Sequence, residues 1–417
     1  MDPCLTLPRH FDNANYSHSS PPGPAIGPRR RAGETAMART LRCLLLLLLG
    51  FGAALGATGA RADDPKGFLE TVHRHVMLTS TVPDNGDQNP YALVVAPVSA
   101  GKVQQGDILV DDFNNLSNLQ GTGASIVDYN PATRKTTLFA TLPHQLPQCP
   151  GGVGLTTAMT MLKTGWVIVG STPSTDGTTR TKGNGCLVVL DPNGHVAQVW
   201  SGPDINGPWG NMAAIDNGGT ASLFISMAGF DVPSFLVRDP ATGYPVIVAK
   251  ATVLRIDLVI PQGQPPRIKS STVIASGFGQ RADRDVFLIG PTGLALGGDG
   301  TLYVSDALAN RIVAIPDAAT RTTTAGTGRE VTKDGLLRRP LSLIMLPNGH
   351  LLTCNGRNGQ VVELDPKTGQ QLYAQWVDTN QAQSPPGNGD LFGMAVTLDG
   401  KGFYYVEDDM NSLMEAR

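Results

Sequence analysis

A chain of 417 residues with a net charge of −3 at pH 7 lacks the basic surplus of a nucleic-acid-binding protein, so we expect no nucleic-acid partner. This length suits either two ordinary domains or one large closed β architecture. The chain contains 49 glycines. That is well above the usual ~7 % of residues, indicates many tight turns, and favours the closed β architecture.

The N-terminal part of the chain has the pattern of an export signal. Residues 1–36 are rich in Pro, Ser and Arg without apolar periodicity, so we predict a disordered extension or an untranslated stretch ahead of Met37. The segment 37–62 then combines Arg39 and Arg42, an apolar run of six leucines and a terminal Ala-Arg-Ala, which is typical of a secretory signal peptide. An uncleaved anchor helix is the alternative, but the run is short and broken by glycines.

Cleavage after residue 62 predicts a mature protein of residues 63–417 that is periplasmic or secreted and has no membrane span. It removes seven arginines and three acids, and so lowers the net charge from −3 to −7. Three cysteines remain, and an oxidising compartment permits a disulfide between two of them. We predict the pair Cys149 and Cys186, which flank loops of one repeat, and expect a buried free thiol at Cys354. Two free thiols at 149 and 186 are the alternative.

A repeat organises the rest of the chain. Apolar runs alternate with Asp-Gly or Asn-Gly turns at Gly300, Gly349 and Gly400, which lie 49 and 51 residues apart. This is the period of a β-propeller blade, and such turns join adjacent antiparallel strands. Counting units on this basis predicts six blades, at 91–143, 153–201, 209–277, 291–325, 340–377 and from Phe392 onwards. Blade three is oversized, with a predicted insertion at 228–250 and a Pro-rich loop at 260–267.

The last blade lacks an outer strand, because the chain ends at Arg417 just after a third strand. The β-branched segment Val72–Val82 precedes blade one and belongs to no blade. We therefore predict an all-β fold, a six-bladed β-propeller whose ring is closed by this N-terminal strand. A mobile N-terminus at 63–85 is the alternative.

One unit supports a family resemblance. Thr292–Leu296, the Asp299-Gly300 turn and the stretch LYVSDALANRIVAI at 302–315 resemble the NHL repeat. The stretch 111–123, with Asn89-Pro90-Tyr91 ahead of it, resembles secreted bacterial NHL-like proteins. The resemblance implies a propeller fold and export, and it implies that loops at one mouth of the central channel carry the function.

The residues expected at that mouth are mostly oxygen donors. We predict that five of them, from five blades, form a site for a divalent cation, Ca²⁺ in particular: Asp112, Asn211, Asp306, Asn355 and Glu407. Further ligand-binding candidates at the mouth are Asp87, Asn89, Tyr91, Asn114, Asn115, Ser171 and Asp408. The alternative for each is a hydrogen bond to the backbone of its own loop.

Two functions follow from different classes. The first is a non-catalytic scaffold that binds a small molecule, polymer or protein through the mouth loops. The second is a divalent-metal-dependent hydrolase that resembles the gluconolactonase family, whose Glu, two Asn and Asp would correspond to Glu407, Asn211, Asn355 and Asp306. A lyase of the virginiamycin-inactivating type would need a suitably placed histidine, and the sequence offers none. Nucleophile-elbow, HExxH and Walker motifs are absent from the sequence.

Overall fold

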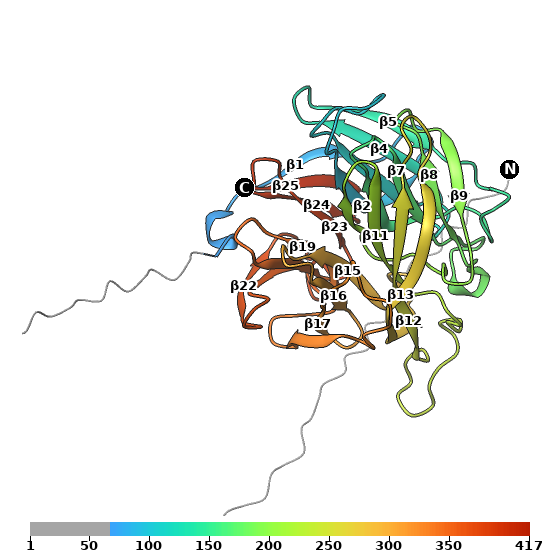
Figure 1. Ribbon diagram of the computed structural model, residues 1–417. Coiled ribbons are helices and arrows are strands. Elements are labelled where there is room, and N and C mark those ends of the chain that lie inside the picture. The colour runs from blue at the N-terminus through green and yellow to red at the C-terminus, as the bar shows by residue number, and fades with distance from the viewer. Residues whose placement is uncertain (1–66) are drawn as a thin grey trace, which may run out of the picture. The chain divides into compact units, whose positions relative to one another are not determined.

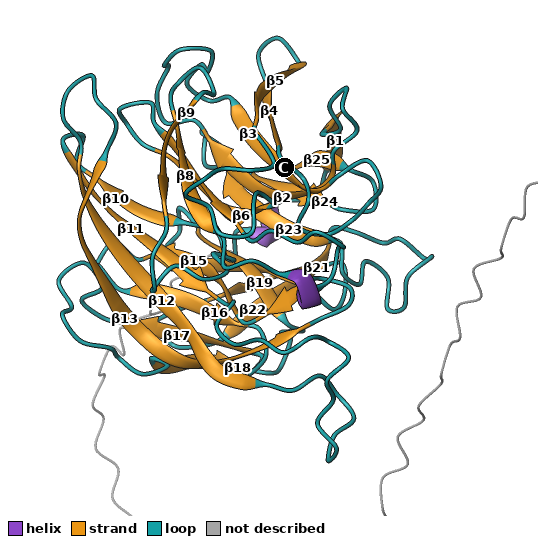
Figure 2. Ribbon diagram, turned by 90° about the vertical axis from the view of Figure 1, so that its right-hand side faces the viewer, coloured by secondary structure: helices purple, strands orange, loops and turns teal. Residues whose placement is uncertain are grey.

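The computed structural model describes residues 67–417, which contain 25 strands in six sheets. The predicted extension at 1–36 and the signal peptide at 37–62 lie outside the described residues. Each sheet is antiparallel and has four long strands, and consecutive sheets follow one another around a ring (Figure 1). Strands make up most of the ring and loops join them (Figure 2). The predicted all-β, six-bladed propeller is confirmed.

Consecutive hairpins build the first three blades. Blade one holds β2 (Gln88–Val95), β3 (Ile108–Asn114), β4 (Ser125–Asn130) and β5 (Lys135–Thr141). Blade two holds β6 (Leu155–Met161), β7 (Val167–Ser171), β8 (Cys186–Leu190) and β9 (Val196–Trp200). Blade three holds β10 (Ala213–Asp216), β11 (Thr220–Met227), β12 (Val248–Val259), β13 (Arg267–Ala282) and the short β14 (Leu288–Ile289).

The other three blades follow the same order. Blade four holds β15 (Pro291–Leu296), β16 (Leu302–Asp306), β17 (Arg311–Ile315) and β18 (Arg329–Lys333). Blade five holds β19 (Pro340–Met345), β20 (Leu351–Asn355), β21 (Gln360–Leu364) and β22 (Gln371–Trp376). Blade six holds β23 (Leu391–Val396), β24 (Phe403–Glu407) and β25 (Ser412–Ala416), with β1 (His75–Ser80) as its outer strand.

The N-terminal strand closes the ring as predicted. β1 pairs antiparallel with β25, with His75 opposite Ala416, and the two lie side by side in blue and red in Figure 1. A 3₁₀ turn η1 (Leu69–Thr71) continues this closure onto blade five. There the backbone N–H groups of Phe68 and Leu69 each donate a 2.9 Å hydrogen bond to the buried Glu363 carboxylate. β1 therefore covers the edge of β25 and gives blade six the four strands of the other blades.

Two blades depart from the simple repeat. In blade three, β11 ends at Met227 and β12 begins at Val248, so the predicted insertion is present. It projects beyond the strands of that blade in yellow-green in Figure 1. In blade four the outer strand is β18 at Arg329–Lys333, beyond the predicted end of that blade at 325. This strand is half exposed and charged, so it lacks the apolar alternation on which the prediction depended.

The disulfide between Cys149 and Cys186 is present, with a Cα–Cα distance of 5.1 Å. It ties the loop ahead of β6 to the start of β8, and a second 3₁₀ turn, η2 (Thr179–Thr181), lies in the loop before β8. Cys354 is a buried free thiol, as predicted. A disulfide is compatible with an oxidising compartment. Within residues 67–417, no helix has the length and apolar character needed to cross a membrane.

Candidate functional site

The strand order brings two kinds of loop to one end of the ring. In an antiparallel blade, the loop before the first strand and the loop after the second strand emerge at the same end. We call this end the mouth. Every predicted site residue lies on, or next to, one of these loops.

Aromatic rings fill the centre of the mouth. They are Tyr91, Phe113, Trp209, Phe287 and Phe392, each at most 4 % exposed, and we call them the aromatic plug. The Tyr91 ring stacks between Phe113 and Phe392, with centroid distances of 4.5 Å and 4.0 Å, and meets Trp209 edge-on at 5.9 Å. Because blades one and three are not neighbours in the ring, the contact between Tyr91 and Trp209 crosses the central axis. The axis at this end is therefore packed with side chains.

Tyr91, a predicted ligand-binding residue, is thus part of the core. Its hydroxyl is buried and has no hydrogen-bond partner among residues 67–417. Burial, together with the carboxylates of Asp408 and Asp283, raises the pKa of Tyr91 well above its ordinary value. Packing explains why a tyrosine occupies position 91. The stacked ring buries a large apolar area at the centre of the mouth.

The five predicted metal ligands have different partners. Asp306 accepts a 2.9 Å hydrogen bond from the Arg311 guanidinium, and Asn355 accepts one of 2.9 Å from the Arg338 backbone. Asn211 instead links three blades, because its side chain bonds the backbone of Leu294 on β15 and of Leu343 on β19.

Asp112 accepts a 3.2 Å hydrogen bond from the Thr81 hydroxyl, and its other oxygen is buried without a partner among the described residues. Glu407 lies beside Asp378. Within residues 67–417, no hydrogen bond or ion pair joins any two of the five, so their joint metal site stays a prediction.

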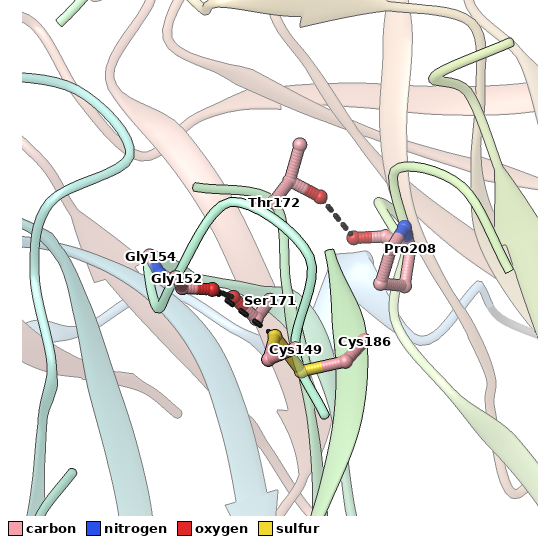
Figure 3. The surroundings of a disulfide bond; sticks show 7 residues. All are labelled: Cys149, Gly152, Gly154, Ser171, Thr172, Cys186 and Pro208. Carbon is pink, nitrogen blue, oxygen red and sulfur yellow. Dashed lines mark hydrogen bonds between the residues drawn. A yellow bond between two sulfur atoms is a disulfide. The ribbon is translucent and has the colours of Figure 1, made fainter. Parts of the chain in front are cut away.

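The other candidates of blades one and two make hydrogen bonds within or between the mouth loops. Asp87 accepts a hydrogen bond from the Ala124 backbone, and Asn115 accepts from the backbone of Ser117 and Leu119. The Asn114 amide donates to Asn118, and the Asn89 backbone donates to the Asn411 side chain. Ser171 lies next to the disulfide, where its hydroxyl accepts from the Gly154 backbone and donates to the Gly152 carbonyl (Figure 3). The contacts of Asn114 and Asn115 are local, as in Asx turns, whereas those of Asp87, Asn89 and Ser171 join different loops of the mouth.

A compact group of carboxylates lies at the mouth of blade six. It consists of Asp378, Asp390 and Asp409, whose nearest ligand oxygens all lie within 4.8 Å of one another, and we call it the acidic triad. Asp378 follows β22, Asp390 precedes β23, and Asp409 lies in the turn between β24 and β25. Asp378 and Asp390 are only 3 % and 4 % exposed, whereas Asp409 is exposed.

Backbone hydrogen bonds fix the loops of the triad. The N–H groups of Val377 and Asp378 donate to the Gly359 carbonyl, at 2.8 Å and 3.0 Å. The Asp408 N–H donates to the Asp390 carbonyl at 2.9 Å, which ties the β24–β25 turn to the start of β23. The Asn380 amide donates to the Asp409 carboxylate. The three carboxylates are therefore held together by the blade itself.

Burial and neighbouring carboxylates favour the protonated forms of the acids in and around the triad. Burial, and next the neighbouring Asp409 carboxylate, raise the pKa of Asp390 to about 9. Burial, and next Asp378, raise the pKa of Glu407 to about 8, and burial followed by Asp409 raises the pKa of Asp408 to about 8. A bound cation would favour the charged forms of all these groups.

The donors of the triad fit a hard divalent cation. One oxygen of Asp378 and one of Asp390 are buried without a hydrogen-bond partner within residues 67–417. A side-chain oxygen of Gln383, in the same loop, is also unpartnered. Carboxylate and amide oxygens are the ligands that Ca²⁺ and Mg²⁺ take, and the absence of Cys and His from the set disfavours zinc.

Glu407 and Asp408 were predicted as candidates from the sequence, but Asp378 and Asp390 were not singled out. These two residues flank a Pro-rich connection at 379–389 that contains no recognisable motif. The sequence could have indicated them only by their position, since each lies where a strand of a blade meets a loop of the mouth. Only the folded loop brings them to within contact of Asp409.

Comparisons with known proteins match the fold alone. No family model matches the chain, and no curated protein is significantly similar in sequence. Among solved structures, a gluconolactonase from Xanthomonas campestris is 13 % identical over 82 % of this chain and 88 % of its own, with a TM-score of 0.48. The calcium-binding protein regucalcin from Agrobacterium tumefaciens is 13 % identical over 81 % and 92 %, with a TM-score of 0.45.

Virginiamycin B lyase from Staphylococcus aureus is also similar, at 12 % identity over 82 % of this chain and 99 % of its own, with a TM-score of 0.45. Identities this low transfer no activity to the chain, because unrelated functions share the propeller fold. The resemblance to NHL repeats stays a prediction from the sequence.

Proposed function

We propose that this protein is a divalent-metal-dependent hydrolase whose cation, Ca²⁺ in the first place, is bound by the acidic triad at the mouth of blade six. The observation that carries the proposal is the pair of unpartnered carboxylate oxygens on Asp378 and Asp390, buried and directed at the same small region as Asp409. Buried carboxylates without a compensating partner are costly, and a cation is the partner that the geometry accommodates.

The chain itself supplies binding and orientation. Asp378 and Asp390 lie deep in the loop, and Asp409 is open to solvent, so a ligand reaches the cation from the Asp409 side. Glu407, which faces Asp378 and is 7 % exposed, adds an oxygen donor behind the triad. When bound, the cation supplies a Lewis acid for a carbonyl and lowers the pKa of a bound water. Hydrolysis of an ester or lactone then adds the OH of water to the acyl carbon and its H to the alcohol oxygen.

A binding scaffold at the mouth is the second candidate. The aromatic plug favours it, because the rings occupy the axis where a substrate would enter a central channel. In this alternative the mouth loops bind a small molecule, polymer or protein without chemistry. Export to the periplasm or the medium is proposed for both candidates, and the disulfide agrees with it.

The test compares cation binding and hydrolysis in one set of variants. Calorimetry with Ca²⁺ and Mg²⁺, on protein treated with a chelator, should detect a site that the double variant Asp378→Asn/Asp390→Asn loses. Asp84→Asn changes an exposed mouth carboxylate that makes no hydrogen bond or ion pair with residues 67–417, so it is the matched control and should keep the site. Glucono-δ-lactone and p-nitrophenyl acetate should be hydrolysed by wild type only with cation. If the protein binds a cation but hydrolyses neither substrate, the hydrolase proposal fails and the binding scaffold remains. If it binds no cation, the metal site is refuted.

A further inference from the structure

A cavity of about 360 Å³ opens at the mouth between blades three, four and five. Four arginines line it, Arg281, Arg338, Arg339 and Arg357, and we call it the arginine pocket. The insertion of blade three adds Tyr244 and Ile247 to its wall. No acidic side chain is part of this lining. The pocket is therefore a concave, strongly basic surface on an otherwise acidic chain.

Two of the guanidinium groups in the pocket are buried and poorly compensated, whereas that of Arg338 donates hydrogen bonds to the Gly335 and Leu337 carbonyls. Arg281 and Arg339 are each only 8 % exposed, and both lie 3.6 Å from the same carboxylate, that of Asp283. The Arg281 Nε has no hydrogen-bond partner within residues 67–417. By contrast, Arg311 of the same face lies 2.9 Å from Asp306 in a close pair. One carboxylate shared at long range leaves two buried guanidiniums short of acceptors.

Arg357 adds a free positive charge to this pair. Its side chain is exposed, lines the cavity, and makes no hydrogen bond or ion pair with any described residue. Burial, and then Arg357 and Arg281, lower the pKa of Arg339 to about 10, against the opposing effect of Asp283 and Asp285. Arg281 also experiences repulsion from Arg357 and Arg238. The four lining arginines thus outnumber the two facing carboxylates.

The backbone holds these arginines in place. The Arg339 N–H donates a 2.8 Å hydrogen bond to the Asn310 side chain, and its carbonyl accepts one of 2.8 Å from Gly356. The Arg338 carbonyl accepts from the Arg357 N–H at 3.1 Å. Tyr244 places its ring 5.5 Å from the Arg281 guanidinium carbon, in the geometry of a cation–π contact. The backbone positions of three arginines and the Arg281 guanidinium are therefore fixed before an anion binds, which lowers the entropic cost of binding.

We propose that the arginine pocket binds a dianionic oxyanion group, the phosphate monoester of a ligand. Four arginines and no carboxylate line the cavity, and this positive excess matches a dianion better than a monoanion. Guanidinium forks pair with the oxygens of tetrahedral anions through parallel charge-assisted hydrogen bonds. This inference is independent of the proposed metal site, since none of its residues belongs to the acidic triad.

The test is calorimetry of the full mature chain with inorganic phosphate, inorganic sulfate and acetate, in a buffer with low salt. We expect phosphate and sulfate to bind and acetate to bind more weakly, because it carries a single charge. Arg357→Gln should weaken phosphate binding about tenfold or more, through loss of one charge-assisted contact. The variant should fold normally, because the Arg357 side chain is exposed and has no partner in the described structure.

Arg329→Gln, an exposed arginine on the outer strand of blade four, is the matched control and should leave binding unchanged. Tyr244→Ala tests the wall contributed by the insertion and should weaken phosphate binding with the fold intact, since Tyr244 is 60 % exposed. The proposal is overturned if wild type binds neither dianion, if acetate binds as tightly as phosphate, or if Arg357→Gln and Arg329→Gln behave alike.

Discussion

The acidic triad and the arginine pocket lie at the same face of the ring and bury charges of opposite sign. In both, buried charged groups have atoms that lack close partners within the described chain. In the triad, two buried carboxylates have unpartnered oxygens, and in the pocket, two buried guanidiniums share one distant carboxylate. Elsewhere on this face, Asp306 and Arg311 compensate each other directly at 2.9 Å. The chain can therefore pair its own charges where it needs only stability. The triad and the pocket, which we call the two poles of this face, are where the proposed cation and the proposed anion would compensate the buried charge.

The aromatic plug separates the two poles. The Tyr91 hydroxyl is influenced by Asp408 on the triad side and by Asp283 on the pocket side. The poles also meet along the β20–β21 loop, where Arg357 belongs to the pocket and Gly359 accepts the backbone hydrogen bonds of Asp378. The aromatic plug thus lies between the acidic triad and the arginine pocket, and the β20–β21 loop connects the two. Substitutions in the aromatic plug, in blade two and at a buried acid outside both poles can separate effects on stability from effects on ligand binding.

The largest effect is expected from the plug itself. Trp209→Ala removes a side chain that is 3 % exposed and touches Tyr91, Phe113 and Phe287, so unfolding in urea should show a loss of about 3–5 kcal/mol. Cation and phosphate binding should both weaken, because both poles rest on this centre. Trp376→Ala, at a tryptophan that is 42 % exposed, is the matched control and should change stability by less than about 0.5 kcal/mol. Equal losses for the two would show that the axis is not a packed core.

A somewhat smaller effect is expected in blade two, away from both poles. Replacing Cys149 and Cys186 by Ala opens a bridge with a sequence separation of 37, which on the chain-entropy account lowers stability by about 3–4 kcal/mol. Here cation and phosphate affinities should stay at the wild-type values in buffer without denaturant. Calorimetry on the folded variant checks this. A loss of either affinity would mean that the poles depend on blade two as well as on the plug.

The sequence predicted the ring better than the site for a definite physical reason. Hairpin turns such as Asp299-Gly300 are local signals in the sequence. The count of strands also shows that the last blade lacks an outer strand, which the segment His75–Ser80 supplies. The pairing of Cys149 with Cys186 followed from two positions in one blade. Site residues carry no comparable local signal, because an Asp that caps its own loop and an Asp that binds a ligand look the same in a sequence.

Particular residues show this difference. Asn355 was predicted as a metal ligand, yet its side chain holds the backbone of Arg338 and Leu336. Tyr91 was predicted at the mouth and does lie there, but its ring is stacked between two others. Asp378 was not singled out, because its place beside Asp390 depends on the path of the whole 379–389 connection. Burial and orientation decide among equivalent side chains, and both are tertiary properties.

The smallest effect concerns a buried acid outside both poles. Asp128 on β4 is 5 % exposed, and burial together with the nearby Asp107 carboxylate raises its pKa to about 7. Because the folded-state pKa lies above the unfolded value, the folded state binds the extra proton between about pH 4 and pH 7. Stability from this group is fully present below about pH 4 and is lost as the pH rises through 7.

Asp128→Asn keeps the shape of the side chain and presents an amide that can donate to Asp107. Relative to wild type it should gain about 1–2 kcal/mol at pH 8 and nothing at pH 4, less than the full value of a three-unit shift because solvent and the protein relax around the charge. Urea unfolding at both pH values measures the difference. Adding Ca²⁺ should leave that difference unchanged, since Asp128 belongs to no predicted cation site. If Ca²⁺ removed it, the cation would bind at Asp107 and Asp128, and the contrast between the triad and other buried acids would fail.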